Sequence, residues 1–315
     1  MIGAYLFIAL IIGLVTPIQT AINSHLRKYV QSPYAASFVS FIVGTLLLSI
    51  ITLLIRHSLL ISSDVFSTQP WWLWLGGIFG FLGLTANILL FPKLGGVQTV
   101  VLPMFGQIVM GMMIDSFGWF RFHQYAFTCF RGIGVIIVLF GVCMVVLNNR
   151  LGHRKCRTDG ISKTYVKGKL FWQLIGIAAG MLMAMQSAIN GQLGIVLHSS
   201  IYAAFISFVI STVILLFINL RGRNCQNILL ALKKNRTWWI WTGGVLGSLY
   251  VMGNAFLVPI IGTGLLVVLG IWGQLLCSLL IDKYGLLGAN KKPITKVQMI
   301  GLLVILLGII FIRII

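Results

Sequence analysis

The chain has 315 residues, of which 59% are hydrophobic and only 9% are charged. A soluble domain carries about 25% charged residues, so this composition excludes a soluble globular protein. The 23 Lys and Arg residues, set against four acidic ones, raise the question of nucleic-acid binding. These cations lie in short segments between long apolar runs, which is typical of the loops of a multi-pass membrane protein. We therefore expect a lipid bilayer as the surroundings and no nucleic-acid partner.

One unit occurs twice in the chain, at a spacing of 167 residues. The stretch GLVTPIQTAINSHLRKYVQSPYAASFVSFIVGTLLL at 13–48 returns as GMLMAMQSAINGQLGIVLHSSIYAAFISFVISTVIL at 180–215. The same offset pairs Trp71 with Trp238 and Gly106 with Gly273. Self-similarity at a fixed spacing over the whole chain indicates a gene duplication.

Ten apolar runs are long enough to cross a hydrocarbon core about 30 Å thick, which needs roughly 20 helical residues. The runs are 2–22, 34–55, 71–91, 96–115, 126–147, 170–190, 201–220, 238–258, 263–281 and 297–315. The sequence therefore predicts an all-α integral membrane protein with ten transmembrane helices, five in each copy. We expect a first repeat at 1–148, a basic cytoplasmic linker at 149–168 and a second repeat at 169–315.

The basic residues predict the orientation of these helices. The loops after the odd-numbered runs hold 19 of the 23 Lys and Arg residues, so we expect them to be cytoplasmic and both termini to lie outside. Arg27 and Lys28 of the first copy become Gly194 and Ile195 in the second. Equivalent loops thus differ in charge, as they must if two five-helix copies lie antiparallel. This arrangement is the inverted-topology repeat of many secondary transporters.

Short motifs near the helix ends resemble those of the YdcZ-like family in the drug/metabolite transporter (DMT) superfamily. They are AIN at 21–23 and 188–190, Gly106-Gln107 with IDSFG at 114–118, and Gly273-Gln274 with IDKYG at 281–285. The resemblance covers essentially the whole chain in a fused, two-copy form. It implies the DMT fold and transport of small molecules, but no particular substrate. The copies differ at 103–105 (PMF) and 270–272 (GIW), so the substrate side can differ between halves.

Polar side chains are costly inside a bilayer, so each one within a predicted helix is a candidate for function. Amides can offer a donor and acceptors to a polar solute. We predict that a substrate cavity is lined by Gln19, Gln107, Gln186, Gln274, Asn87 and Asn254. The alternative is that these amides join helices, at roughly 0.6 kcal/mol for each hydrogen bond, and it carries most weight for Asn87 and Asn254.

Asp115 and Asp282 stand at the carboxyl ends of the fourth and ninth predicted helices. A helix dipole disfavours a carboxylate there, so a functional reason is expected, although a solvated boundary residue is the alternative. Our hypothesis pairs Asp115 with Asn190 as an outer gate and Asp282 with Asn23 as an inner gate. Arg131 is the candidate ionic partner of Asp115, and the two carboxylates are also candidate proton carriers.

The remaining residues predict neither a metal site nor a cofactor, because the five cysteines and five histidines are scattered along the chain. The predicted spans hold no paired carboxylates and no nucleophile–base pair, which disfavours an enzyme. The sequence therefore favours a secondary transporter of the plasma (inner) membrane that moves a small neutral or zwitterionic metabolite or drug-like solute, with export as the expected direction. A flippase for lipids or lipid-linked precursors is the alternative, and a homodimer is left open.

Overall fold

The computed structural model describes residues 2–60, 63–126, 128–147, 163–222, 225–234, 237–288 and 293–313. Every regular element in these ranges is a helix. The helices are α1 (Ile2–Val30), α2 (Pro33–Arg56), α3 (Ser63–Thr68), α4 (Gly76–Phe117), α5 (Cys129–Leu147), α6 (Lys163–Val196), α7 (Ser200–Arg221), α8 (Cys225–Lys234), α9 (Gly243–Ile261), α10 (Thr263–Tyr284) and α11 (Lys296–Arg313). Most of the expected linker lies outside the described residues, and α6 already begins at Lys163.

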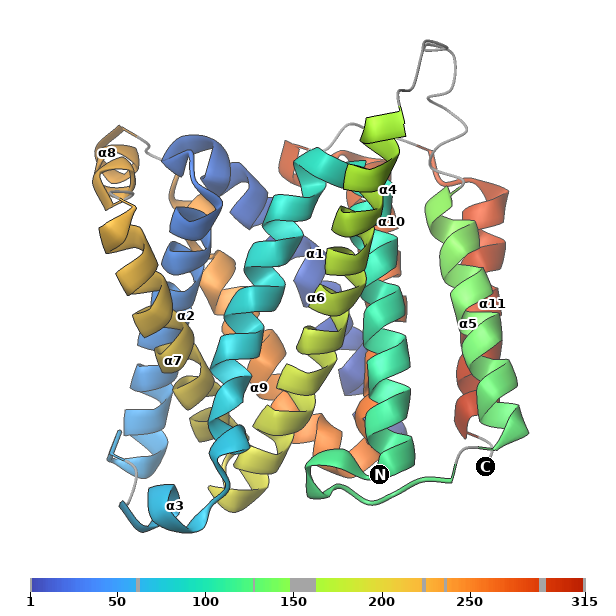
Figure 1. Cartoon of the computed structure of the whole chain (residues 1–315), viewed down its shortest axis with the longest axis horizontal. Coiled ribbons are helices and arrows are strands. Elements are labelled where there is room, and N and C mark those ends of the chain that lie inside the picture. Colours follow the sequence, from blue (N-terminus) through green and yellow to red (C-terminus); the bar gives the residue numbers. More distant parts are fainter. Residues whose placement is uncertain are drawn as a thin grey trace.

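The element labelled α4 contains two of the expected transmembrane helices. Its 42 residues would form a straight helix about 63 Å long, roughly twice the thickness of a hydrocarbon core. Figure 1 shows instead that α4 rises from the end of the bundle where α3 lies and then descends to the same end. The apolar parts of its two arms are Trp71–Leu90, which begins in a short 3-10 helix, and Val101–Phe117.

Seven helical segments of the described chain are long and apolar enough to span a membrane. Three shorter apolar helices, Val101–Phe117, Cys129–Val145 and Lys296–Ile312, bring the apolar segments of the described chain to the ten that the sequence predicts. They divide five and five between the repeats. The prediction of an all-α membrane protein made of two five-helix units is therefore confirmed.

The two repeats run in opposite directions through the bundle. In Figure 1, α1 begins at the end where both termini lie, whereas α6 begins at the opposite end. Two pairs of equivalent residues touch each other where α2 crosses α7. The Oγ1 atoms of Thr45 and Thr212 are 2.8 Å apart, and the ring centroids of Phe41 and Phe208 are 5.0 Å apart. A residue in contact with its own equivalent lies on the pseudo-twofold axis, so this contact marks the centre of the inverted repeat.

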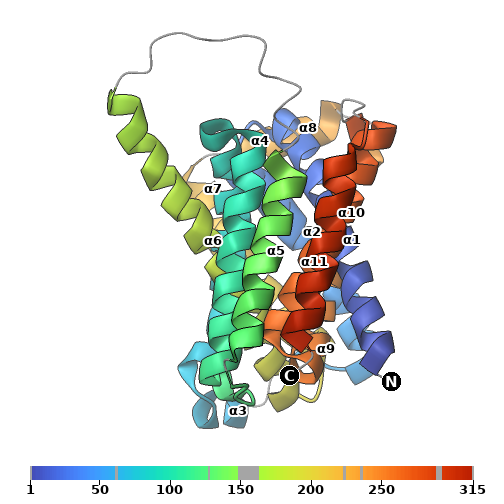
Figure 2. The ribbon, with the colours of Figure 1, turned by 90° about the vertical axis from the view of Figure 1, so that its right-hand side faces the viewer.

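Small residues allow the repeats to approach closely. A Cβ atom at Gly77 would collide with the carbonyl oxygen of Ser207, and one at the equivalent Gly244 would collide with that of Ser40. In the same way α5 and α11, side by side in Figure 2, meet where Gly134 faces Gly308 and Gly141 faces Gly301. Packing of this kind holds membrane helices together where the hydrophobic effect is absent.

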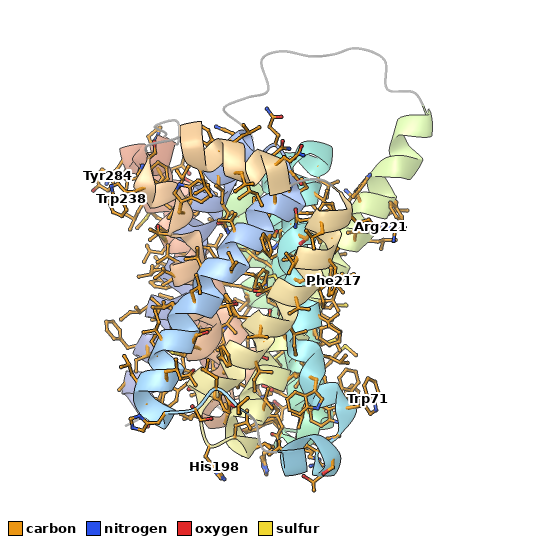
Figure 3. The ribbon with its side chains drawn as sticks, turned by 90° about the vertical axis from the view of Figure 1, so that its left-hand side faces the viewer. Trp71, His198, Phe217, Arg221, Trp238 and Tyr284 are labelled. Carbon is orange, nitrogen blue, oxygen red and sulfur yellow. The ribbon has the colours of Figure 1, made fainter. Side chains whose placement is uncertain are left out.

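Exposed aromatic residues mark the two ends of the bundle. Trp71 and its equivalent Trp238 are 73% and 76% exposed, and they lie towards opposite ends in Figure 3. Tyr284 and Arg221 lie at the same end as Trp238. Tryptophan and tyrosine favour the boundary between lipid and water, so these residues place the bundle across a membrane.

Candidate functional site

A cavity of about 710 Å³ lies between the two repeats. Residues from α1, α2 and both arms of α4 form its first-repeat side, and residues from α6, α7, α9 and α10 form its second-repeat side. Phe41 and Phe208 are in the lining, so the cavity reaches the pseudo-twofold axis and hence the middle of the bundle. Near the carboxyl end of α1 the lining includes the exposed residues Ser24, Lys28 and Gln31, so the cavity opens to the surface there.

Five of the six amides expected around a cavity line this one: Gln19, Gln107, Gln186, Gln274 and Asn87. The sixth, Asn254, is not among the lining residues. It is buried, and its Nδ2 donates to Oγ of Ser187 at 3.4 Å, which joins α9 to α6. This is the helix-joining alternative that the sequence left open for this residue.

The amides of α1 and α6 pack on glycines of the other repeat. A Cβ atom at Gly80 would lie 2.5 Å from Nε2 of Gln186, and one at Gly247 would lie 2.5 Å from Nε2 of Gln19. One turn further along, the Oδ1 atoms of Asn23 and Asn190 occupy the space beside Gly243 and Gly76. The glutamine and the AIN asparagine of each repeat thus share one helix face, which contacts the glycine face of the partner repeat.

The two AIN asparagines differ in their hydrogen bonds. Asn23 lines the cavity, and its Nδ2 donates to Oγ of Ser40 at 3.3 Å. The equivalent Asn190 is only 1% exposed, and neither its amide nor Oγ of Ser207 has a hydrogen-bond partner among the described residues. The two equivalent asparagines therefore have different surroundings although their sequences match.

Asp115 joins the end of α4 to the start of α10. Its Oδ1 accepts a hydrogen bond from the N–H of Thr263 at 2.9 Å, and its Oδ2 accepts one from the N–H of Gly264 at 2.8 Å. The carboxylate, 4% exposed, thus caps the first turn of a helix of the other repeat. Because the amino end of a helix favours negative charge, α10 offsets the unfavourable position of Asp115 on its own helix.

The structure gives Asp115 a different hydrogen-bonding partner from the one in the gate hypothesis. Its hydrogen bonds go to α10, whereas Asn190 packs beside Gly76. Arg131 interacts electrostatically with Asp115, and its guanidinium lies 5.1 Å from the ring centroid of Tyr125. The side chain of Asp282 lies outside the described part of the structure, so the expected inner pair with Asn23 cannot be placed.

The glycines of the IDSFG and IDKYG motifs end the two equivalent helices. Gly118 and Gly285 have φ values of 63° and 65°, and each donates its N–H to the isoleucine four residues earlier. A left-handed residue at this position is the usual end of a helix and favours glycine. The motif therefore combines a helix stop with, at Asp115, a carboxylate that reaches the neighbouring repeat.

Sequence reasoning missed the apolar wall of the cavity and the partner of Asp115. Met183, Leu84 and Phe208 line the cavity, but nothing in the sequence separates such residues from ordinary helix packing. The backbone N–H groups of Thr263 and Gly264 also give no side-chain signal. The predicted run 263–281 placed a helix start there, and Gly262, with a φ of 82°, separates α9 from α10; neither feature identifies Asp115 as the residue that caps it.

These features together define a membrane transporter of the DMT class, built from two inverted five-helix repeats around a central cavity. A family model described as "Putative inner membrane exporter, YdcZ" matches residues 4–144 and again residues 171–311, with both bounds shifted by the repeat spacing. The matches cover most of the chain, which therefore belongs to the YdcZ family of the DMT superfamily. Proteins of this family are described as exporters, hence as transporters rather than enzymes.

A solved crystal structure has the same fold. It aligns with 99% of this chain and 96% of its own, with a TM-score of 0.61 and 15% sequence identity. At that identity the likeness concerns the fold alone. A comparison with curated proteins gives no match.

Proposed function

We propose that this protein is a secondary transporter that exports a small neutral or zwitterionic solute by alternating access between its two repeats. The observation that carries the proposal is the central cavity, which is open at the basic end of α1 and lined by both repeats. With the basic loops in the cytoplasm, this conformation faces inward. A solute would enter from the cytoplasm and leave after the repeats exchange conformations.

Equivalent positions in the two repeats support such an exchange. Thr20 and its equivalent Ser187 each donate to the carbonyl four residues earlier. Thr20 is exposed and lines the cavity, whereas Ser187 is buried and accepts from Asn254. The same sequence position is thus open in one copy and closed in the other. If the copies swap these conformations, the cavity opens at the opposite end.

We propose that Asp115 locks the closed end and that Asp282 forms the equivalent lock when the basic end closes. Protonation of Asp115 would remove the negative charge that the first turn of α10 favours, which would link the lock to a proton gradient. Arg131 lies where it can stabilise the charged form. These carboxylates are therefore proposed both as gate residues and as sites of proton coupling.

The cavity lining supports a neutral or zwitterionic solute. Among the described residues, those lining the cavity include no Asp or Glu, and the two cations, Arg27 and Lys28, lie at the open end of α1. The deeper lining combines amides with apolar side chains. Such a surface suits an apolar body that carries a few hydrogen-bonding groups.

Solute exchange in proteoliposomes tests this function. We expect the wild-type protein to exchange at least one neutral or zwitterionic solute. The Gln186→Leu substitution should lower the apparent affinity of the protein for that solute about three- to tenfold, the equivalent of one hydrogen bond. Gln192→Leu is the matched control, because Gln192 is a buried glutamine of the same helix outside the lining. Lipid scrambling without solute exchange would contradict the proposal and favour a flippase.

A further inference from the structure

We propose that Asn87 and Gln107 form a subsite for the oxygen of an uncharged carbonyl group, such as a ketone or amide, on an otherwise apolar solute. The subsite lies in the wall of the central cavity, at the position of the Met183 sulfur. The inference rests on the proposed function, since it takes this cavity to be the one that receives the solute.

Two amide donors converge on the sulfur of Met183. The Nδ2 atom of Asn87 is 3.5 Å from Sδ, and the Nε2 atom of Gln107 is 3.9 Å from the same sulfur. These amides come from the two arms of α4, and the methionine comes from α6. All three residues line the cavity. The geometry therefore defines one point in the wall that two N–H groups approach.

A thioether is a weak hydrogen-bond acceptor, so both donors are poorly satisfied by it. Methionine is unbranched and flexible, so its sulfur can move aside without a change in the backbone. A carbonyl oxygen at this point would accept from both amides more strongly than the sulfur does.

The second repeat shows that this arrangement is not a requirement of the fold. Asn254, the equivalent of Asn87, donates to Ser187 and lies outside the lining. The position equivalent to Met183 is Thr16. The hydroxyl of Thr16 neither donates nor accepts a hydrogen bond among the described residues. The converging donors thus occur in one half only, which is expected of a group that meets an asymmetric solute.

The neighbouring residues select the rest of the solute. Leu84, Met104 and Phe208 give the cavity wall around the amides an apolar character. The donors are neutral amides, and Arg27 already donates to the carbonyl of Ile88 at 2.9 Å. The chemistry therefore suits an uncharged carbonyl beside an aromatic or aliphatic body.

Photolabelling of the purified protein with benzophenone tests this subsite without any need for transport. On near-ultraviolet irradiation the ketone oxygen takes a hydrogen atom from a nearby C–H group, and the two carbon radicals join to give a tertiary alcohol. The labelled residue is then located by peptide mass spectrometry. We expect cavity labelling at or next to Met183 in the wild-type protein, and labelling confined to lipid-facing residues would overturn the proposal.

Competition in the wild-type protein provides a measurement that does not depend on the folding of any variant. Fluorenone and fluorene have nearly the same shape and differ in one carbonyl oxygen. We expect fluorenone to compete with cavity labelling at least about fivefold more strongly, the equivalent of roughly one hydrogen bond. Equal competition by the two compounds would contradict the proposal.

Variants then assign the effect to the two amides. In Asn87→Leu and Gln107→Leu, we expect fluorenone and fluorene to compete about equally with cavity labelling. In Asn254→Leu, we expect fluorenone to remain the stronger competitor. Met183→Leu, which removes the sulfur but neither donor, should keep the preference as well. If Asn254→Leu abolishes the preference as fully as Asn87→Leu, the assignment is wrong. Solute exchange with no carbonyl preference would leave the transporter function intact and refute only the subsite.

Discussion

At the residue scale, the proposal that Asp115 holds one end of the protein closed rests on its hydrogen bonds to the other repeat. Its two carboxylate oxygens accept the N–H groups of Thr263 and Gly264, so one side chain of the first repeat caps a helix of the second. Hydrogen bonds to a charged group contribute about 1.5–3 kcal/mol each, more than those between neutral groups. Two such hydrogen bonds are of the strength that the proposed lock requires.

Substitution of Asp115→Asn should weaken this closed end, because the amide is neutral and offers only one acceptor to the two N–H groups. In a background without native cysteines, we expect a cysteine at Ser187 to react about tenfold faster with a maleimide, the equivalent of a loss of about 1.4 kcal/mol. A cysteine at Thr20 is the control and should react no faster than before. An unchanged rate at Ser187 would show that Asp115 does not hold this end closed.

At the element scale, helices of opposite repeats pack through glycines whose positions the duplication repeats. A Cβ atom at Gly180 of α6 would collide with the carbonyl oxygen of Pro103 in α4. The equivalent of Pro103 is Gly270 of α10, whose own Cβ would meet no atom within 4 Å. Gly180 is therefore tightly constrained by its neighbour, whereas Gly270 has room for a side chain.

This difference predicts opposite outcomes for two similar substitutions. Gly180→Ala should lower the free energy of unfolding by about 1–3 kcal/mol, because a backbone carbonyl cannot move aside as a flexible side chain can. Gly270→Ala should change it by less than about 0.5 kcal/mol. Thermal unfolding of both variants in the same detergent measures the comparison. Equal destabilisation would contradict the packing described for α6 and α4.

At the scale of the whole molecule, the duplicated sequence predicted the fold and five of the amides that line the cavity. Gln107 and Gln186 could be identified because an amide stands out in an apolar helix and recurs in both copies. Asn87 and Asn254 are the same residue at equivalent positions, yet only Asn87 lines the cavity. Their difference comes from the conformation of each repeat, which two matching sequences cannot reveal. The partner of Asp115 was equally hidden, since it is backbone.

The most direct test of alternating access compares Thr20→Cys and Ser187→Cys in oriented membrane vesicles, with a maleimide that does not cross the bilayer. We predict that the cysteine at Thr20 reacts from the side of the basic loops and that the one at Ser187 reacts from the side of the termini. Conditions that increase reaction at one position should decrease it at the other. Reaction of both positions from the same side, or at rates that never change in opposite directions, would contradict the account.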